Sequence, residues 1–397
     1  MSEGRLVAVL RAAHMTHLID FMVMLPLGAQ FMAAFHASPA DLGRLVFAYT
    51  VSAGVSGLIV SAVIDRFDRS RVLRAVYAVF IVSLVVTATA GSLDALVVAR
   101  VVAGISGGVL SALIQSVVAE VVAPAQRATA IGRVMSGHAL SAVIGVPAGL
   151  WVAAALGWRG PFVAVLAIAS VVFLGLGRHL PPVPARRGGR DAAAAVSLRQ
   201  VLAGRALGGL CLTFLVTASC YAVIAYIAPY WLRNVGIAEA RLPWLYLLAG
   251  AISFFTTPLS GRLADRHGRF PVFMVTTLLS TAGILLATHA PALALPAALA
   301  VSSLFFVTVY ARWVPTVALL AELPPPPVRG AFMMLNGVTT QLGMGAGAMF
   351  SGELIEIGAD GRLAGFGTVG IVAALLSLAG IAVARVITYS NTKDRSG

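Results

Sequence analysis

Apolar segments of about twenty residues recur along the whole chain, and their length limits what the chain can fold into. A helix rises about 1.5 Å per residue, so each segment matches the roughly 30 Å hydrocarbon core of a bilayer. A chain of 397 residues with 59% hydrophobic and 11% charged residues also cannot be a soluble globular protein. We predict twelve membrane-spanning helices, at residues 14–35, 43–64, 72–91, 95–120, 129–154, 160–178, 205–230, 241–264, 271–290, 292–320, 329–352 and 364–387.

Spans of this length predict an all-α integral membrane protein, because an unpaired backbone polar group is costly in lipid. The first apolar stretch runs to about Phe35 and carries no small-residue cleavage site. It is too long for the core of a signal peptide, so we expect it to be retained as the first helix.

The positive charges indicate the orientation. The net charge is +13, which in a soluble protein would point to nucleic acid or an acidic partner, but here the placement of the cations matters more. With both termini inside, 21 of the 28 Lys and Arg residues fall on the inner side. The outward segments hold only Arg44, Arg159, Arg233, Arg241 and Arg362. The positive-inside rule therefore places both termini in the cytoplasm.

A nine-residue charged segment, which we call the clasp, occurs twice, at residues 61–69 and 261–269. Asp65 and Asp265 are 200 residues apart, and a second match between segments 120–127 and 322–329 has an offset of 202 residues. Two matches at nearly one offset indicate an internal duplication. We therefore predict two pseudo-symmetric six-helix bundles, residues 1–178 and 205–397, joined by a cytoplasmic linker at residues 179–204 that is rich in proline, glycine and arginine.

The residue types of the clasp suit a short loop between two membrane helices. Glycine permits a tight reversal, arginines hold the loop at the cytoplasmic face, and the aspartate can cap a helix end or pair with the arginines. A solvated charged turn is the simpler interpretation, and it explains one copy but not two at a fixed offset.

Together, the twelve spans, the six-plus-six repeat, the central linker and the doubled clasp resemble the major facilitator superfamily. The second clasp matches the family signature, whereas the first has Ser61 and Asp68 in its two glycine positions. The resemblance implies a central cavity and alternating access, with a cytoplasmic latch in which Glu120 is the partner acid. The expected latch residues are Asp65, Arg66, Arg69 and Glu120, with Asp265, Arg266, Gly268 and Arg269 at the second clasp beginning with Gly261.

Two further stretches resemble family motifs. Arg100, followed by Gly104, Gly107 and Gly108, is similar to the proton-coupling motif in helix four. A charged group within a span costs at least a few kcal/mol, so Arg100 has either a task or a partner, unless it snorkels to the outer surface. In helix five, Gly145, Pro147 and Gly149 are similar to a signature of the family's exporters. Such residues permit a bend and close packing of helices.

Asp20 is the only acidic residue that we place deep in a span. A carboxyl group in such a place is functional by default, because burial and a nearby cation act oppositely on its ionisation and so allow a proton switch. His17 lies one turn earlier and could share the proton, or could simply face water. A structural hydrogen bond is the alternative for Asp20. Counting the rise per residue places Asp20 and Arg100 roughly 10 Å apart along the membrane normal.

Arg312 lies near the middle of the tenth span, and its repeat equivalent is Leu110. We expect it to bind an anionic or π-rich substrate, or to balance Asp20. Other polar or aromatic candidates for the cavity, most of which could instead serve helix packing, are Tyr49, Gln115, His138, Tyr221, Tyr226, Asn336 and Gln341.

No motif supports an enzyme, a cofactor or a metal site: the chain has no nucleotide-binding loop, no His-Glu-x-x-His and no cysteine cluster, and Cys211 and Cys220 are taken as packing residues. The leading interpretation is a proton-coupled exporter of small organic compounds, similar to the superfamily's drug and sugar efflux permeases. A proton symporter for a small anionic metabolite is the alternative, and a membrane sensor without transport is less favoured. We expect a monomer in the bacterial inner membrane, whose partners are a small-molecule substrate, protons and the lipid bilayer, without nucleic acid.

Overall fold

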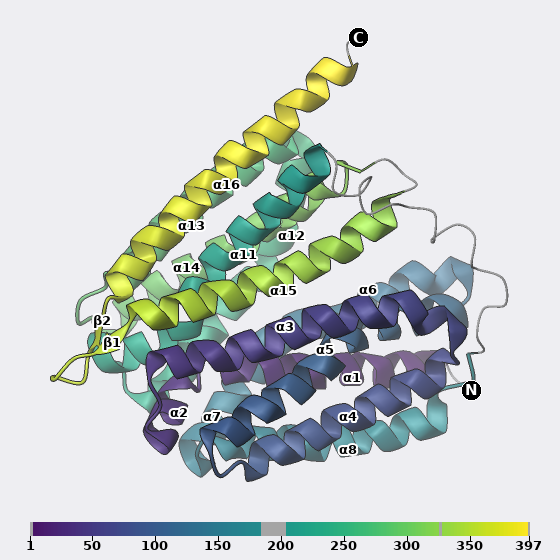
Figure 1. The fold of residues 1–397 in the computed structure, drawn as a ribbon, viewed down its shortest axis with the longest axis horizontal. Coiled ribbons are helices and arrows are strands. Elements are labelled where there is room, and N and C mark those ends of the chain that lie inside the picture. The colour runs from purple at the N-terminus through teal and green to yellow at the C-terminus, as the bar shows by residue number, and fades with distance from the viewer. Residues whose placement is uncertain (1–2, 184–203, 325–327, 396–397) are drawn as a thin grey trace. The chain divides into compact units, whose positions relative to one another are not determined.

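The computed structural model describes residues 3–183, 204–324 and 328–395, which are almost entirely helical (Figure 1). The chain divides into two compact units. The first comprises Met1–Ala37 and Arg44–Gly189, and the second comprises Ser38–Gly43 and Arg190–Gly397. Most of the linker expected at residues 179–204 lies outside the described residues.

The helices follow the predicted order. From the N-terminus they are α1 (Glu3–Met24), α2 (Gly28–Phe35), α3 (Pro39–Val63), α4 (Arg69–Thr89), α5 (Leu93–Val121), α6 (Pro124–Leu140), α7 (Val146–Leu156) and α8 (Arg159–His179). The chain continues with α11 (Arg205–Tyr230), α12 (Leu242–His267), α13 (Arg269–Thr288), α14 (Leu295–Leu320), α15 (Arg329–Leu354) and α16 (Phe366–Arg395). A π-helical turn at Ser141–Gly145 joins α6 to α7, and another at Trp231–Val235 extends α11.

The predicted twelve-helix architecture is confirmed. Among the described residues, eleven helices are long and apolar enough to cross a membrane. The remaining predicted span corresponds to α15, whose sequence is rich in glycine and polar residues. Its glycines allow close packing: a Cβ at Gly343 or Gly347 would collide with Thr217 or Ala218 of α11.

The predicted bounds of the first span were wrong by about half a helix. The prediction was 14–35, whereas α1 ends at Met24 and a turn at Leu25–Leu27 leads into the short helix α2. Pro26 stands in this turn and has no N–H group to continue the helix. The apolar run continues across the break, so hydrophobicity alone placed the helix too far along the chain.

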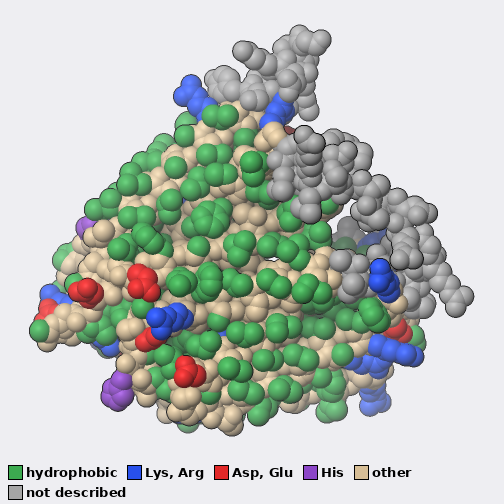
Figure 2. All heavy atoms as spheres, in the orientation of Figure 1, with side chains coloured by type: hydrophobic (Ala, Val, Ile, Leu, Met, Phe, Trp, Pro, Cys, Tyr) green, Lys and Arg blue, Asp and Glu red, His purple; other side chains and the backbone are tan. Residues whose placement is uncertain are grey.

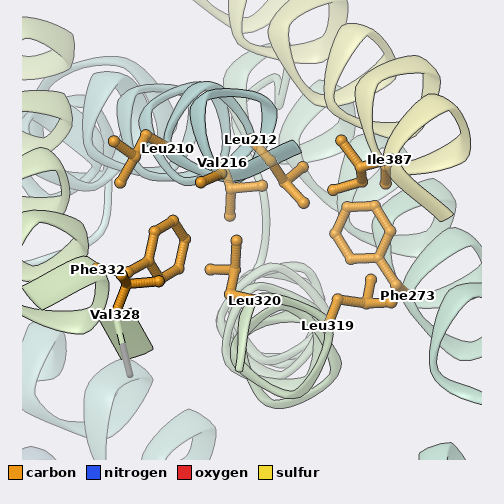
Figure 3. Close-up of a cluster of buried hydrophobic side chains, with 11 residues drawn as sticks. Leu210, Leu212, Val216, Phe273, Leu319, Leu320, Val328, Phe332 and Ile387 are labelled. Atoms are coloured by element: carbon orange, nitrogen blue, oxygen red, sulfur yellow. The ribbon is translucent and has the colours of Figure 1, made fainter. Parts of the chain in front are cut away.

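The second unit has a well-packed apolar core at the end where α11 begins. Side chains from α11, α13, α14, α15 and α16 meet there, and Figure 3 shows them converging between the helices. The labelled members are Leu210, Leu212, Val216, Phe273, Leu319, Leu320, Val328, Phe332 and Ile387. The span of α11 is the most buried of the eleven candidates, so it is the central element of this unit.

The outer faces of the helices carry exposed large apolar side chains. On the face shown in Figure 2, hydrophobic side chains cover most of the helix surfaces, and charged ones gather towards the helix ends. Leu174 and Phe255, for example, are 73% and 74% exposed. Exposed apolar surface on this scale marks an interaction site, and here it fits contact with lipid.

Between α15 and α16 the chain forms a small hairpin instead of a plain loop. Strand β1 (Glu356–Ile357) pairs antiparallel with β2 (Leu363–Ala364). Asn234 binds the far side of β2, because its side-chain nitrogen donates to the Leu363 carbonyl over 3.0 Å and its oxygen accepts from the Leu363 N–H over 2.9 Å. The hairpin is therefore tied to the end of α11.

Candidate functional site

The two clasps reverse the chain by different means. In the second, Gly268 adopts φ +90°, a conformation that favours glycine, between α12 and α13. In the first, Asp68 has an ordinary φ of −64° and caps α4, accepting hydrogen bonds from the N–H groups of Ser70 at 2.9 Å and Arg71 at 3.1 Å. The carboxylate that replaces the second family glycine is thus used as a helix cap.

The same ion pair occurs at both clasps. Arg69, at the start of α4, pairs with Glu120 near the end of α5. In the second unit, Arg269 at the start of α13 pairs with Glu322, just after α14. These pairs join residues related by the two sequence offsets of 200 and 202 residues, so the duplication extends to side-chain contacts.

The remaining latch candidates are placed less specifically. Arg66, Asp265 and Arg266 are exposed. The side chain of Asp65 lies outside the described residues.

The chain that leaves α8 returns to the first clasp. The N–H of Arg69 donates to the carbonyl of Val183 over 3.0 Å, and the Ser70 hydroxyl donates to the carbonyl of Pro181 over 2.5 Å. Val183 is buried. The residue that pairs with Glu120 therefore also holds the start of the linker.

Asp20 and Arg100 form a buried ion pair in the first unit. The Nη1 of Arg100 donates to both carboxylate oxygens of Asp20, over 3.2 and 3.1 Å, and the two side chains are 0% and 1% exposed. The Nη2 donates to the Thr87 hydroxyl over 2.5 Å. The guanidinium also lies 5.5 Å from the ring centroid of Phe162, a distance that permits a cation–π contact.

The separation of roughly 10 Å predicted for this pair was wrong, and the bounds of α1 explain why. Because α1 ends at Met24, Asp20 lies in the last turn of its helix instead of at its middle. Arg100 lies two turns after the start of α5, which runs antiparallel to α1. The end of α1 and the start of α5 therefore bring Asp20 and Arg100 to the same depth. The snorkelling alternative for Arg100 does not hold, since its side chain is fully buried.

Small residues bring the helix-five segment close to α1 on both sides of Asp20. A Cβ at Gly145 would lie 2.5 Å from Ile19 Cγ1, and one at Gly149 would lie 2.5 Å from Val23 Cγ2. Pro147 has no N–H group to donate, and it follows the π-helical turn at Ser141–Gly145, whose wider spacing accommodates the missing hydrogen bond. The helix-five signature therefore fixes the position of the helix that carries Asp20.

The helix-four glycines perform a similar task for α3. Gly104 and Gly107 lie against Tyr49, and Gly108 lies against the backbone of Ala53, in contacts that leave no room for a Cβ. The ring of Tyr49 in turn stacks on Phe21, with centroids 4.6 Å apart. Tyr49 is thus packed beside the segment of α1 that holds Asp20.

His17 belongs to a separate polar cluster one turn from Asp20. Its Nε2 lies 3.1 Å from the Ser111 hydroxyl and 3.4 Å from Nδ1 of His14. Both histidines are buried. The interpretation of His17 as a water-facing residue does not hold, because its side chain is only 3% exposed.

Arg312 is fully buried within the second unit. Its Nη1 donates to the Ser377 hydroxyl over 2.9 Å. Its Nη2 has three acceptors on α11: the carbonyl of Val216 at 3.3 Å, the hydroxyl of Ser219 at 3.4 Å and Cys220 Sγ at 2.7 Å. No carboxylate of the described residues pairs with it, so its neighbours are all neutral.

The other cavity candidates are dispersed. The Tyr226 hydroxyl donates to the carbonyls of Pro39 and Ala348, over 2.8 and 3.0 Å, and Asn336 accepts a hydrogen bond from Thr213 over 2.5 Å. Gln115, Tyr221 and Gln341 are partly buried on α5, α11 and α15, and His138 is exposed on α6.

Sequence reasoning missed the neutral partners of Arg100 and Arg312. Thr87 lies four residues after Ser83 on the buried face of α4, which is a detectable pattern. Cys220, taken as a packing residue, stands 200 residues after Asp20, the offset that relates the two clasps. In the part of the chain that the structure describes, no group of three or more metal-binding side chains occurs.

The sequence matches the description "Major Facilitator Superfamily" over residues 12–348 and, in a second match, over residues 209–396. The chain belongs to the major facilitator superfamily. It is therefore a multi-pass membrane protein of a transporter superfamily, and the family predicted from its motifs is confirmed. The repeated Arg–Glu pairs and the buried Asp20–Arg100 pair described above are features of this superfamily member.

Solved structures share this superfamily fold over nearly the whole chain. A bacterial homologue of the human lysosomal transporter Spinster, solved inward-facing and unoccupied, has 18% identity and a TM-score of 0.82, with 99% of each chain covered. The nucleoside transporter NupG has 13% identity and a TM-score of 0.77 over 98% of this chain and 99% of that one. A D-xylose–proton symporter has 17% identity and a TM-score of 0.75 over 95% and 97%.

Proposed function

We propose that the protein is a proton-coupled secondary transporter that exports small organic compounds by alternating access. The observation that carries this proposal is the buried Asp20–Arg100 pair. A charged pair at this depth is costly to desolvate and is seldom retained for stability alone. A proton and the Arg100 guanidinium compete for the same carboxylate, so protonation of Asp20 breaks the pair.

The pair gives proton binding a structural consequence. Asp20 is on α1, Arg100 on α5 and Thr87 on α4, so three helices of the first unit meet at one guanidinium. When Asp20 is protonated, Arg100 loses its counter-charge and is left with neutral partners, among them Met24, Thr87 and Phe162. Coupling follows if substrate occupancy and protonation disfavour each other, as antiport requires.

Proteoliposomes containing a pH-sensitive dye test this proposal. Proton movement is measured after adding a panel of small sugars, nucleosides and drug-like amines, and the active compound is then followed as a radiolabelled solute. Asp20→Asn should abolish gradient-driven accumulation and retain substrate binding and downhill exchange. The matched control is Asp360→Asn, which removes a carboxylate that is 64% exposed. Full uphill transport by Asp20→Asn would refute the assignment.

The sign of the proton movement separates this function from the alternative, a proton symporter for a small anionic metabolite. Export by antiport moves protons against the substrate, whereas symport moves both in one direction. The observation favouring symport is Arg312, whose charge has no carboxylate partner among the described residues. A protein that binds a solute and moves neither solute nor protons would be a sensor.

For the latch, we propose that Arg69–Glu120, with Asp65 and Arg66, stabilises a state closed towards the cytoplasm. Asp65→Asn or Asp265→Asn removes one charge from a clasp, so either should shift the balance of inward and outward states without unfolding the bundle. Cysteine labelling from the periplasmic side measures that balance, and unchanged labelling in both variants would leave the solvated-turn interpretation. We further propose a monomer in the bacterial inner membrane with both termini in the cytoplasm.

A further inference from the structure

Three arginines are buried among the described residues, and only one of them has no counter-charge. Arg69, Arg100 and Arg312 are 3%, 0% and 0% exposed. Arg69 pairs with Glu120 and Arg100 with Asp20. Arg312 has four hydrogen-bond acceptors, and each is a neutral group. A lone buried charge costs several kcal/mol unless an opposite charge compensates it.

The local backbone holds Arg312 firmly. Pro315 follows within one turn and cannot donate to the Ala311 carbonyl, and the Ser260 hydroxyl donates to this carbonyl over 2.7 Å instead. The Thr316 hydroxyl donates to the Arg312 carbonyl over 2.7 Å. The guanidinium therefore projects from a well-satisfied helix towards α11 and α16.

The polar groups around the guanidinium leave part of it available. A guanidinium has five N–H donors, and the Nε donor of Arg312 has no partner. The hydroxyls of Ser219 and Ser377 lie 2.6 Å apart, and both are fully buried. Cys220 Sγ is a weak acceptor, which a stronger acceptor can replace. The Ser219 hydroxyl donates to the carbonyl of Ala373 over 2.8 Å, so its proton is already used. The Ser377 hydroxyl, which can rotate, and the unused Nε donor are the groups that remain for an anion.

We propose that Arg312, together with the hydroxyl of Ser377, binds a monovalent anionic group. That group is either a small inorganic anion such as chloride or the carboxylate of a transported solute. The carboxylate form rests on the proposed transport function, because it names the class of solute, whereas anion binding itself does not. The anion is the counter-charge of Arg312, as Asp20 is the counter-charge of Arg100 and Glu120 that of Arg69.

Thermal unfolding of the purified full-length protein in detergent tests the proposal. Ionic strength is held constant while the bulky anion isethionate is exchanged for chloride in one series and for benzoate in another. A ligand that binds the folded state alone raises its stability with concentration, so the apparent Tm should rise and saturate. A response to chloride identifies an inorganic anion site, and a response to benzoate alone identifies a carboxylate site.

Variants assign the response to this arginine. Arg312→Gln should abolish the rise in Tm. Arg312→Lys, which keeps the charge without the planar fork, should raise the apparent Kd for the anion by about tenfold. Arg241→Gln is the matched control in the same unit, because Arg241 is exposed, and it should respond as the wild type does. An unchanged response in Arg312→Gln, or no response of the wild type to either anion, would overturn the proposal.

A second variant keeps the test decisive if Arg312→Gln does not fold. Cys220→Asp places a carboxylate where Sγ lies 2.7 Å from Arg312 Nη2, so the charge is compensated internally. This variant should fold and should no longer respond to chloride or benzoate. A full wild-type response in Cys220→Asp would count against the site. Since none of these measurements uses a proton gradient, their outcome is independent of whether Asp20 couples transport.

Discussion

Breaking the Asp20–Arg100 pair from one side should be more damaging than removing both charges. Asp20→Asn leaves the Arg100 guanidinium, which is 0% exposed, without its carboxylate. Removing one partner of a buried pair costs about 3–5 kcal/mol, whereas replacing both by neutral groups is often close to neutral. We therefore expect Asp20→Asn/Arg100→Gln to be more stable than either single variant.

The measurement is a double-mutant cycle by equilibrium unfolding in mixed micelles. The reference is the exposed Arg362–Asp360 pair, whose nearest atoms are 3.8 Å apart and whose side chains are 63% and 64% exposed. An exposed pair contributes about 0–1 kcal/mol, so its cycle should show little coupling. If the Asp20 and Arg100 substitutions add within about 0.5 kcal/mol, the two groups are independent and the reasoning fails.

Three further variants test the surroundings. Gly145→Val pushes a side chain into Ile19 of α1, so it should lower the Tm and also reduce transport; unchanged values of both would contradict the close packing. Asp68→Ala removes the cap of α4 and should lower the free energy of unfolding by about 1 kcal/mol. Asp68→Asn is the conservative control, because asparagine is also a good N-cap and should retain most of the stability. Thr87→Val removes an acceptor of the buried Arg100 and should lower the free energy of unfolding by about 1–3 kcal/mol. An unchanged free energy of unfolding would mean that the hydroxyl does not support the ion pair.

The twelve helices could be predicted because lipid imposes length and apolar character on each span, and both are visible in the sequence. The first helix shows the limit of this reasoning. Its apolar run passes through Pro26 without a polar interruption, so hydrophobicity gave no sign of the turn. The bounds of α1 then decided the depth of Asp20, and one local error became an error of about two turns in the predicted site.

The charged residues of the site were predictable, and their neutral partners were not. Asp20, Arg100 and Arg312 are conspicuous because charge in a span is rare. Hydroxyl side chains such as Thr87 and Ser377 are common in membrane helices and usually bond to their own backbone. Apart from the spacing of Ser83 and Thr87 on one face of α4, nothing in the sequence distinguishes the few that turn towards an arginine. The neutral surroundings of Arg312 therefore required the arrangement of α11, α14 and α16 in space.

The bonds that hold Pro181 and Val183 against α4 have a mechanical consequence. Tension on the chain beyond Val183 is delivered to the backbone of Arg69 before it reaches α8. A force on the chain beyond Val183 would therefore act first on Arg69, the residue that forms the ion pair with Glu120. A connector lengthened after Val183 would leave both bonds and every side chain of the two clasps unchanged, so connector length can be varied separately from the first clasp.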